Sequence, residues 1–184
     1  MGQDGFTPLV TARLRLRPPR NDDAPAIFRR YASVAEVVRY VGWPRHTSLD
    51  DTRQFLQFSV AEWQRWPVGP LLIEDREAGE LIGSTGLSFE TSYRASTGYV
   101  LALDKWGMGY ASEALGAVIE LARRYRVVRL YALCHAEHGP SRRVLEHCSF
   151  ALEAVMRRYL VFPNLGTAEP QDVCCYSLTD DGAV

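Results

Sequence analysis

The chain has 184 residues, of which 47% are hydrophobic and 23% are charged. That length and composition are typical of one globular domain and argue against a disordered, collagen-like or coiled-coil protein. Because 21 lysine and arginine residues face 22 aspartate and glutamate residues, the chain lacks the positive charge that nucleic-acid-binding proteins usually carry. No apolar run approaches the roughly 20 residues that span a membrane.

The N-terminal segment and the cysteines indicate the cellular compartment in which we expect the protein. Charged residues interrupt the N-terminal segment, which therefore lacks the pattern of a secretory signal peptide. Four cysteines are present and none forms a C-x-x-C motif: Cys134, Cys148, Cys174 and Cys175. The neighbouring Cys174 and Cys175 would point to opposite faces of a strand, which makes them poor disulfide partners. We therefore expect free thiols in a reducing cytoplasm, and no membrane partner.

The first part of the chain predicts one strand and three helices. Residues 11–17 alternate leucine with arginine, which is the pattern of a half-buried strand. Asn21 or Asp22 is the expected N-cap of a first helix, and a short second helix is expected over residues 34–40. A third helix is expected to begin at Ser48, since its apolar residues follow helical spacing: Phe55, Leu56, Val60 and Trp63.

The second part of the chain predicts mostly strands, from apolar runs bounded by turn residues. The predicted elements follow in chain order: strands over residues 71–74, 81–88 and 97–103, a helix from about residue 110, a strand over 128–134, a helix over 140–148, and two strands between 150 and 178. This order of a hairpin meander and a βαβα unit predicts a mixed α/β fold. We expect a single domain over residues 11–179, with tails over 1–10 and 180–184.

The most informative segment is residues 106–112 (Trp-Gly-Met-Gly-Tyr-Ala-Ser), which we call the glycine loop. It joins a predicted strand to the start of a predicted helix. Glycines let a ligand approach the backbone, and the first N–H groups of a helix have no internal partner, so a pyrophosphate is the natural guest. The alternative is that Gly107 and Gly109 only make a tight turn. A Walker loop is absent, and Ser112 stands where a dinucleotide fingerprint needs a third glycine.

At this point the sequence resembles a known family. Three segments are similar to the signature motifs of the GNAT N-acetyltransferases: residues 98–101, the glycine loop extended to residue 115, and residues 141–146 with Phe150. Three more resemble the branch that acetylates the N-terminal alanine or serine of ribosomal proteins: residues 14–17, 43–48 and 81–83. The resemblance spans residues 11–178. It implies a central, mostly antiparallel sheet that is splayed at its fourth and fifth strands and flanked by helices.

The resemblance also implies an acyltransferase with an acetyl-CoA site. Family members hold the pyrophosphate of coenzyme A on the amides of the glycine loop, and the pantetheine arm adds to the strand before it. Carried over, this predicts the following cofactor-binding residues: Leu101, Ala102, Leu103, Trp106, Gly107, Met108, Gly109, Tyr110, Ala111, Ser112, His138 and Ser141. No metal is expected, because the spacing within residues 134–138 fits neither a zinc finger nor a helical zinc motif.

The implied reaction is direct attack of a primary amine on the thioester, without an enzyme nucleophile. Ser141 matches the serine that protonates the departing thiolate in this branch, although a polar residue in the first turn of a helix is the plain alternative. His138 stands where the family has asparagine, and Ser149 where it has glycine. The resemblance assigns no general base. A proton path through water is one alternative, and three side chains are the others: Glu90, His135 and Glu137.

The predicted acceptor is the α-amine of a protein or peptide N-terminus. The pKa of an α-amine is near 7.8, against about 10.4 for lysine, so a weaker general base is enough to deprotonate it. Tyr40 and Trp43 are the expected substrate-binding residues, because relatives shape the acceptor pocket from this region. The alternatives are a small amine (an aminoglycoside, a polyamine or an amino acid) and a non-catalytic acyl-CoA-binding module. An acidic groove would favour cationic small amines. A homodimer is expected by analogy alone, and nucleic acid is not an expected partner.

Overall fold

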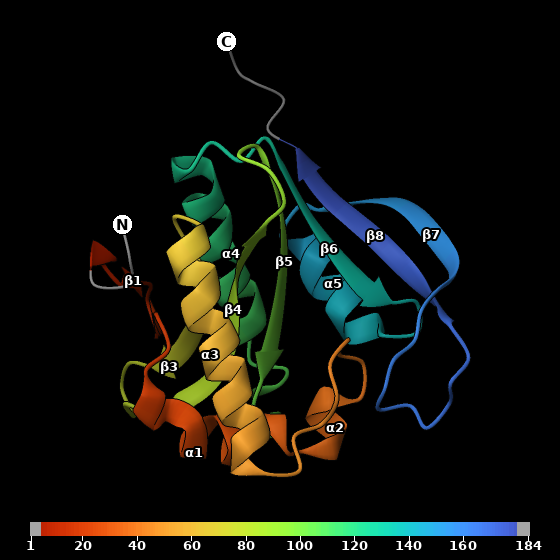
Figure 1. Cartoon of the computed structure of the whole chain (residues 1–184). Coiled ribbons are helices and arrows are strands. Elements are labelled where there is room, and N and C mark those ends of the chain that lie inside the picture. The colour runs from red at the N-terminus through yellow and green to blue at the C-terminus, as the bar shows by residue number, and fades with distance from the viewer. Residues whose placement is uncertain (1–4, 180–184) are drawn as a thin grey trace.

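The computed structural model describes residues 5–179, which form one eight-stranded sheet flanked by helices (Figure 1). The strand order is β1-β2-β3-β4-β5-β6-β8-β7, and every neighbouring pair is antiparallel except β5 with β6. The strands have these bounds: β1 Leu9–Val10, β2 Leu14–Arg17, β3 Pro70–Asp75, β4 Leu81–Phe89, β5 Arg94–Leu101, β6 Arg129–His135, β7 Ala151–Leu160 and β8 Gln171–Thr179. The expected mostly antiparallel sheet is confirmed.

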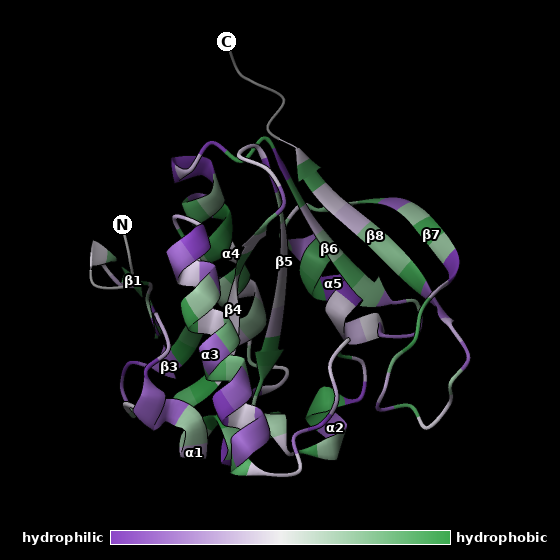
Figure 2. Cartoon of the chain, in the orientation of Figure 1, coloured by the Kyte–Doolittle hydropathy of each residue, from purple (hydrophilic) through white to green (hydrophobic). Residues whose placement is uncertain are grey.

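Helices cover both faces of this sheet. They have these bounds: α1 Ala24–Ile27, α2 Ala35–Val38, α3 Leu49–Arg65, α4 Tyr110–Arg124 and α5 Gly139–His147, with a 3₁₀ turn over Asn21–Asp23, a π-helical turn over Phe28–Ala32 and a 3₁₀ turn over Leu103–Lys105. α3 carries alternating hydrophilic and hydrophobic bands, as expected of a helix that buries one face (Figure 2).

Two hydrophobic clusters lie against the sheet, and β3 contributes to both. Its residues Leu71 and Ile73 belong to the larger cluster, which α4 covers, whereas Leu72 belongs to the smaller cluster, which contains α1, α2 and Leu56 of α3. Successive residues of a strand point to opposite faces, so one apolar strand serves two layers. The fold is therefore a helix–sheet–helix sandwich with its core on both sides of β3.

The parallel pair β5 and β6 is joined at one end only. Residues Arg94 to Ser96 of β5 pair with Arg129 to Tyr131 of β6, and no later residue of either strand is paired with the other. Counted from β2, these are the fourth and fifth strands, so the predicted splay is confirmed. The open edge of β5 beyond Ser96 is free to accept hydrogen bonds from a ligand.

The structure corrects several predicted boundaries. The expected tail over residues 1–10 contains β1, where Leu9 pairs with Leu16 of β2. The first helical turn begins at Asn21 with Arg20 as its N-cap, so Asn21 and Asp22 lie inside the turn and do not cap it; the Asp23 carboxylate accepts the N–H of Arg20 at 2.6 Å. The strand expected over residues 97–103 begins and ends earlier, as β5. The expected tail over residues 180–184 lies outside the described residues.

Arg17 also differs from the simple alternation. The pattern placed it on the outer face of β2, but its side chain is 8% exposed. It donates to Asp23 at 2.7 Å and to Glu74 of β3 at 2.6 Å. Because two carboxylates surround the guanidinium, this arginine joins β2, β3 and the first helical turn through a buried ion-pair network.

Candidate active site

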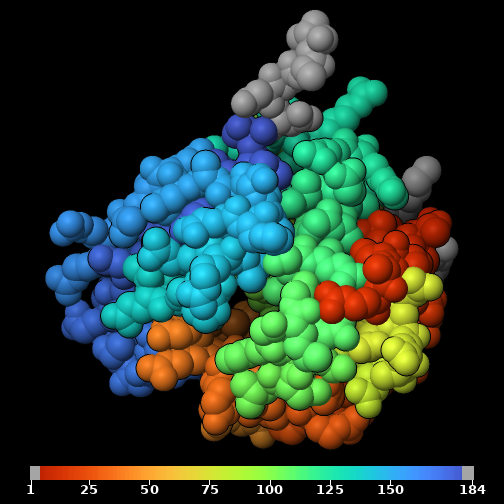
Figure 3. Space-filling view, turned by 180° about the vertical axis from the view of Figure 1, so that it is seen from behind, coloured from red at the N-terminus to blue at the C-terminus, as the bar shows by residue number. Residues whose placement is uncertain are grey.

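The separation of β5 from β6 opens a cavity of about 1110 Å³. The back view shows it as a hollow bordered by green, cyan and orange segments, which belong to the glycine-loop region, the α5 region and the region of α2 (Figure 3). Its lining also includes residues of β4, β5 and β6 and the loop after β7. Segments far apart in the sequence therefore meet at the split in the sheet.

The glycine loop forms one end of this cavity. Gly107 has φ +72° and Gly109 has φ +80°, both in the left-handed region that favours glycine. Gly109 is the N-cap of α4, so the free N–H groups of the first helical turn follow directly. Six of the seven loop residues line the cavity: Trp106, Gly107, Gly109, Tyr110, Ala111 and Ser112. The loop is a tight turn and also a cavity wall, so the two readings of its glycines are compatible.

The predicted strand contacts divide into two groups. Leu101, at the end of β5, lines the cavity, and its carbonyl accepts the indole N–H of Trp106 at 2.9 Å. Ala102, Leu103 and Met108 do not line it. Ala102 is buried, with its N–H bonded to the carbonyl of Ile82 at 2.8 Å. The strand edge available to a ligand is therefore that of residues 97–101, before the chain turns into the 3₁₀ segment.

Ser141 lies across the split from β5, in the first turn of α5. Its Oγ is 3.0 Å from the hydroxyl of Tyr99, which lies on β5, and the same hydroxyl is 3.1 Å from the Ser141 carbonyl oxygen. Burial raises the pKa of Tyr99, so its phenol is protonated at neutral pH and acts as a donor. Tyr99 lies within the family-like segment of residues 98–101, but the sequence indicates no role for it, because its partner lies 42 residues away.

Tyr40, Trp43 and His138 lie at another wall of the cavity. The ring of Tyr40 stacks on His138 at 4.9 Å between centroids and also contacts the ring of His135 at 4.7 Å. Burial lowers the pKa of both histidines, which favours their neutral form at neutral pH. His135 does not line the cavity, whereas His138 does. We call Tyr40, Trp43, Phe55 and Phe162 the aromatic wall.

The two predicted carboxylate bases lie elsewhere. Glu90 follows β4 at the end where β5 and β6 are still paired, and it contacts Arg94 at 2.6 Å and the hydroxyl of Tyr131. Glu137 is exposed. Neither carboxylate lines the cavity, so neither is placed to act as the general base there. Within residues 5–179 no aspartate or glutamate lines the cavity at all.

Ser149, the second departure from the family pattern, has a structural explanation. It has φ +67°, in the left-handed region, just after α5. The backbone N–H of the following Phe150 donates to the carbonyl of Leu145 at 3.0 Å, as in a helix C-cap. A glycine would adopt this conformation with less strain, and Ser149 does not line the cavity. This departure therefore leaves the site itself unaltered.

Comparison with known proteins now identifies the fold and the family. The sequence profile described as "Acetyltransferase (GNAT) domain" matches residues 13–151. The chain belongs to this family. It is 32% identical over 181 residues to the uncharacterized N-acetyltransferase YoaA of Bacillus subtilis (strain 168), covering 94% of this chain and 97% of that relative. The predicted family and the prediction of an acetyl-CoA-dependent acetyltransferase are confirmed.

Solved GNAT structures share the whole fold. A GNAT acetyltransferase from Bacillus anthracis superposes with a TM-score of 0.82 at 21% identity, covering 96% of this chain and all of that one (100%). RimL, a ribosomal L7/L12 α-N-protein acetyltransferase in complex with coenzyme A, superposes with a TM-score of 0.83 at 24% identity, covering 94% and 97%. At these identities the likeness establishes the GNAT fold. Within residues 5–179 no helix is long and apolar enough to cross a membrane, and no three potential metal ligands cluster.

Proposed function

We propose that this GNAT enzyme transfers acetyl from acetyl-CoA to the α-amine of a protein or peptide N-terminus, by direct attack in a ternary complex. The cavity fits acetyl-CoA, because a glycine loop with free helix N-terminal amides lies at one end and an unpaired strand edge leads away from it. The glycine loop holds the pyrophosphate, and residues 97–101 of β5 hold the pantetheine arm. The coenzyme A complex of RimL, which has the same fold, supports this assignment.

The observation that carries the acceptor assignment is the chemistry of the cavity lining. The aromatic wall is apolar, and no carboxylate lines the cavity in the described part of the chain. A site for an aminoglycoside or a polyamine needs carboxylates to pair with several ammonium groups. A peptide N-terminus brings one amine, and its first side chain can pack on apolar rings. The name of RimL, which specifies an α-N-protein acetyltransferase, supports the same class.

The chemistry asks three things of the protein. The amine must be neutral, which an α-amine with a pKa near 7.8 reaches readily. Its surplus proton leaves through water or to the neutral imidazole of His138, the uncharged base that lines the cavity beside Tyr40. Ser141 gives one proton to the departing thiolate, and the hydroxyl of Tyr99 stabilises the serine oxygen at that moment. The thiolate gains one proton from Ser141, the amine loses one, and that proton returns to Ser141 through water, so the step balances.

The test has two stages, binding and transfer. Titration calorimetry with acetyl-CoA, and with NADH and ATP as controls, should show selective binding. Gly109→Glu should abolish it, because a carboxylate would stand in the pyrophosphate site. Gly166→Glu is the matched control, since Gly166 has a similar φ of +70° and does not line the cavity. Wild-type binding by the Gly109 variant would overturn the loop assignment.

Transfer is then measured on a panel of amines. Peptides with a free N-terminal alanine or serine should be acetylated, whereas N-terminally blocked lysine peptides, spermidine and an aminoglycoside should not. Acetylation of the polyamine or aminoglycoside alone would overturn the acceptor assignment and favour a small-amine enzyme. Tight acetyl-CoA binding without transfer to any amine would favour the non-catalytic acyl-CoA-binding module.

A further inference from the structure

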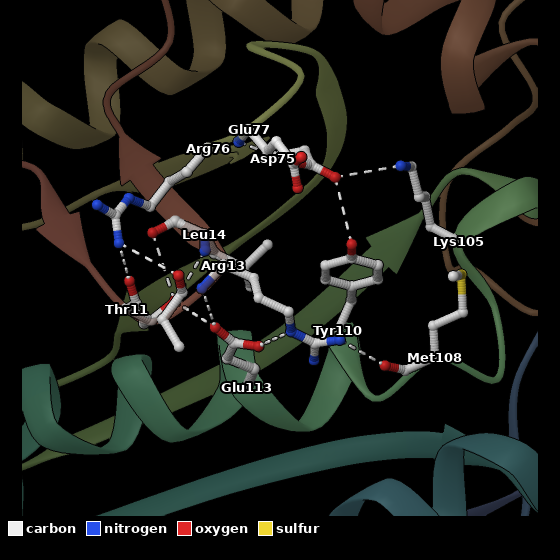
Figure 4. Close-up of polar contacts among 11 residues, drawn as sticks. Thr11, Arg13, Leu14, Asp75, Arg76, Glu77, Lys105, Met108, Tyr110 and Glu113 are labelled. Carbon is white, nitrogen blue, oxygen red and sulfur yellow. Dashed lines mark hydrogen bonds and ion pairs between the residues drawn. The ribbon is translucent and has the colours of Figure 1, made fainter.

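Arg13, which precedes β2 and does not line the cavity, reaches the glycine loop with its side chain (Figure 4). Its Nη1 donates to the carbonyl of Met108 at 2.9 Å. Its guanidinium also lies over the ring of Tyr110, 4.2 Å from the centroid. Arg13 Nη2 is so close to the loop that a Cβ built on Gly109 would lie 3.4 Å from it. One arginine therefore contacts Met108 and Tyr110 and lies beside Gly109 between them.

Glu113, in the first turn of α4, fixes this arginine in place. Its Oε2 accepts from Arg13 Nε at 2.7 Å, and its Oε1 accepts from the backbone N–H of Arg13 at 2.8 Å and from the hydroxyl of Thr11 at 2.6 Å. Burial opposes ionisation, but the hydrogen bonds from Thr11 and Arg13 lower the pKa of Glu113. The carboxylate is therefore charged at neutral pH and holds both the side chain and the backbone of Arg13 (Figure 4).

The bond to Met108 determines the direction of the next N–H group. The peptide that joins Met108 to Gly109 is planar and trans, so its C=O and its N–H point in opposite directions. Because Arg13 holds the carbonyl on its own side, the N–H of Gly109 points away from Arg13. Gly109 lines the cavity, whereas Met108 does not. None of the hydrogen bonds within residues 5–179 uses the N–H of Gly109.

We propose that Arg13, held by Glu113, is a positioning residue that presents the Gly109 N–H to the pyrophosphate of acetyl-CoA. The inference rests on the proposed function, since it assumes that acetyl-CoA occupies the cavity. It also explains why a carboxylate is tolerated beside a bound diphosphate. The charge of Glu113 is neutralised by Arg13, so the pair adds orientation to the loop without adding net repulsion.

The test compares acetyl-CoA with S-acetylpantetheine, since only acetyl-CoA carries the pyrophosphate that the loop would hold. S-acetylpantetheine has the thioester and the pantetheine arm but no pyrophosphate. Arg13→Met should weaken acetyl-CoA binding about tenfold or more, the size expected for losing hydrogen bonds to a charged group, and should leave S-acetylpantetheine binding unchanged. Arg15→Met is the matched control, because the Arg15 side chain is 47% exposed and its ion pair with Glu74 is long, at 4.0 Å.

A second variant separates positioning from simple charge. Glu113→Gln removes a negative charge near the diphosphate, but its amide nitrogen cannot accept from Arg13. Positioning by Arg13 therefore predicts weaker acetyl-CoA binding, whereas an effect of charge alone predicts tighter binding and would overturn the inference. Arg13→Lys, which keeps the charge without the planar guanidinium, should also bind more weakly than the wild type.

The remaining outcomes separate this inference from the proposed function. A wild-type chain that binds no acetyl-CoA would overturn both. Equal acetyl-CoA binding by the wild type and Arg13→Met, or an equal loss for acetyl-CoA and S-acetylpantetheine, would overturn this inference alone. The measurement concerns binding and not transfer, so its result is independent of which amine accepts the acetyl group.

Discussion

Tyr99→Phe tests how the proton reaches the departing thiolate. Under the proposed mechanism, the serine oxygen becomes negative as Ser141 gives up its proton, and the Tyr99 hydroxyl at 3.0 Å stabilises it. A hydrogen bond to a charged group contributes about 1.5–3 kcal/mol, which corresponds to a roughly 10- to 100-fold lower kcat for the variant. The KM for acetyl-CoA should stay within about twofold, because no loop or strand-edge amide is altered.

The same experiment becomes decisive as a double-mutant cycle. Ser141→Ala should lower kcat by about 100-fold or more, the usual size of general acid catalysis. Adding Tyr99→Phe to that variant should then change little, because the partner of the phenol is already gone. The assay is the steady-state release of free thiol from acetyl-CoA for all four proteins, with a thermal melt of each. Tyr93→Phe is the control, since Tyr93 is exposed and outside the cavity.

Two results would refute this reasoning. Losses that simply add in the double variant would mean that Tyr99 and Ser141 act independently. A rise in KM at unchanged kcat would mean that the phenol only shapes the binding site, and Ser141 would then return to its alternative role in the first turn of α5.

Three further predictions concern stability. Burial lowers the pKa of three histidines: His46, His135 and His138. The unfolded chain therefore binds more protons below about pH 6.5, and the urea midpoint should fall between about pH 7 and 5.5; a flat profile would contradict this. Arg17→Met breaks the buried pair and should cost about 3–5 kcal/mol in chemical denaturation, against less than about 1 kcal/mol for the exposed Arg15→Met; equal costs would contradict the network. Gly83→Ala should yield little folded protein, because its Cβ would lie 2.1 Å from the carbonyl oxygen of Val100, whereas Gly98→Ala meets no atom within 4 Å and should melt normally.

The helices were predictable because their signals are local. α3 was expected to begin at Ser48, and Ser48 is its N-cap, with its Oγ accepting the N–H of Asp51 at 3.3 Å and the Asp51 carboxylate accepting the N–H of Ser48 at 3.0 Å. Such a capping box involves residues three apart, so it is visible in the sequence. β1 was missed for the opposite reason, since two residues become a strand only by pairing with β2.

The site was predictable only where it is made of neighbouring residues. The glycine loop carries its backbone requirement in its own glycines, so its place at a helix N-terminus followed from the pattern. Glu90 was a reasonable carboxylate after a strand, but the sequence does not show that this strand end lies where β5 and β6 remain paired. The contact of Arg13 with Glu113 spans 100 residues, and no local pattern indicates it.

The split between β5 and β6 connects these features. The strand edge that would receive the pantetheine arm and the phenol of Tyr99 both belong to β5, whereas Ser141 comes from α5, which follows β6. The proposed proton donor and its supporting hydroxyl therefore come from opposite sides of this split. A change that altered this divergence should disturb acetyl-CoA binding and proton delivery together. Changes in the aromatic wall, which lies in the loop after α2, on α3 and in the loop after β7, should instead affect the KM for the amine alone.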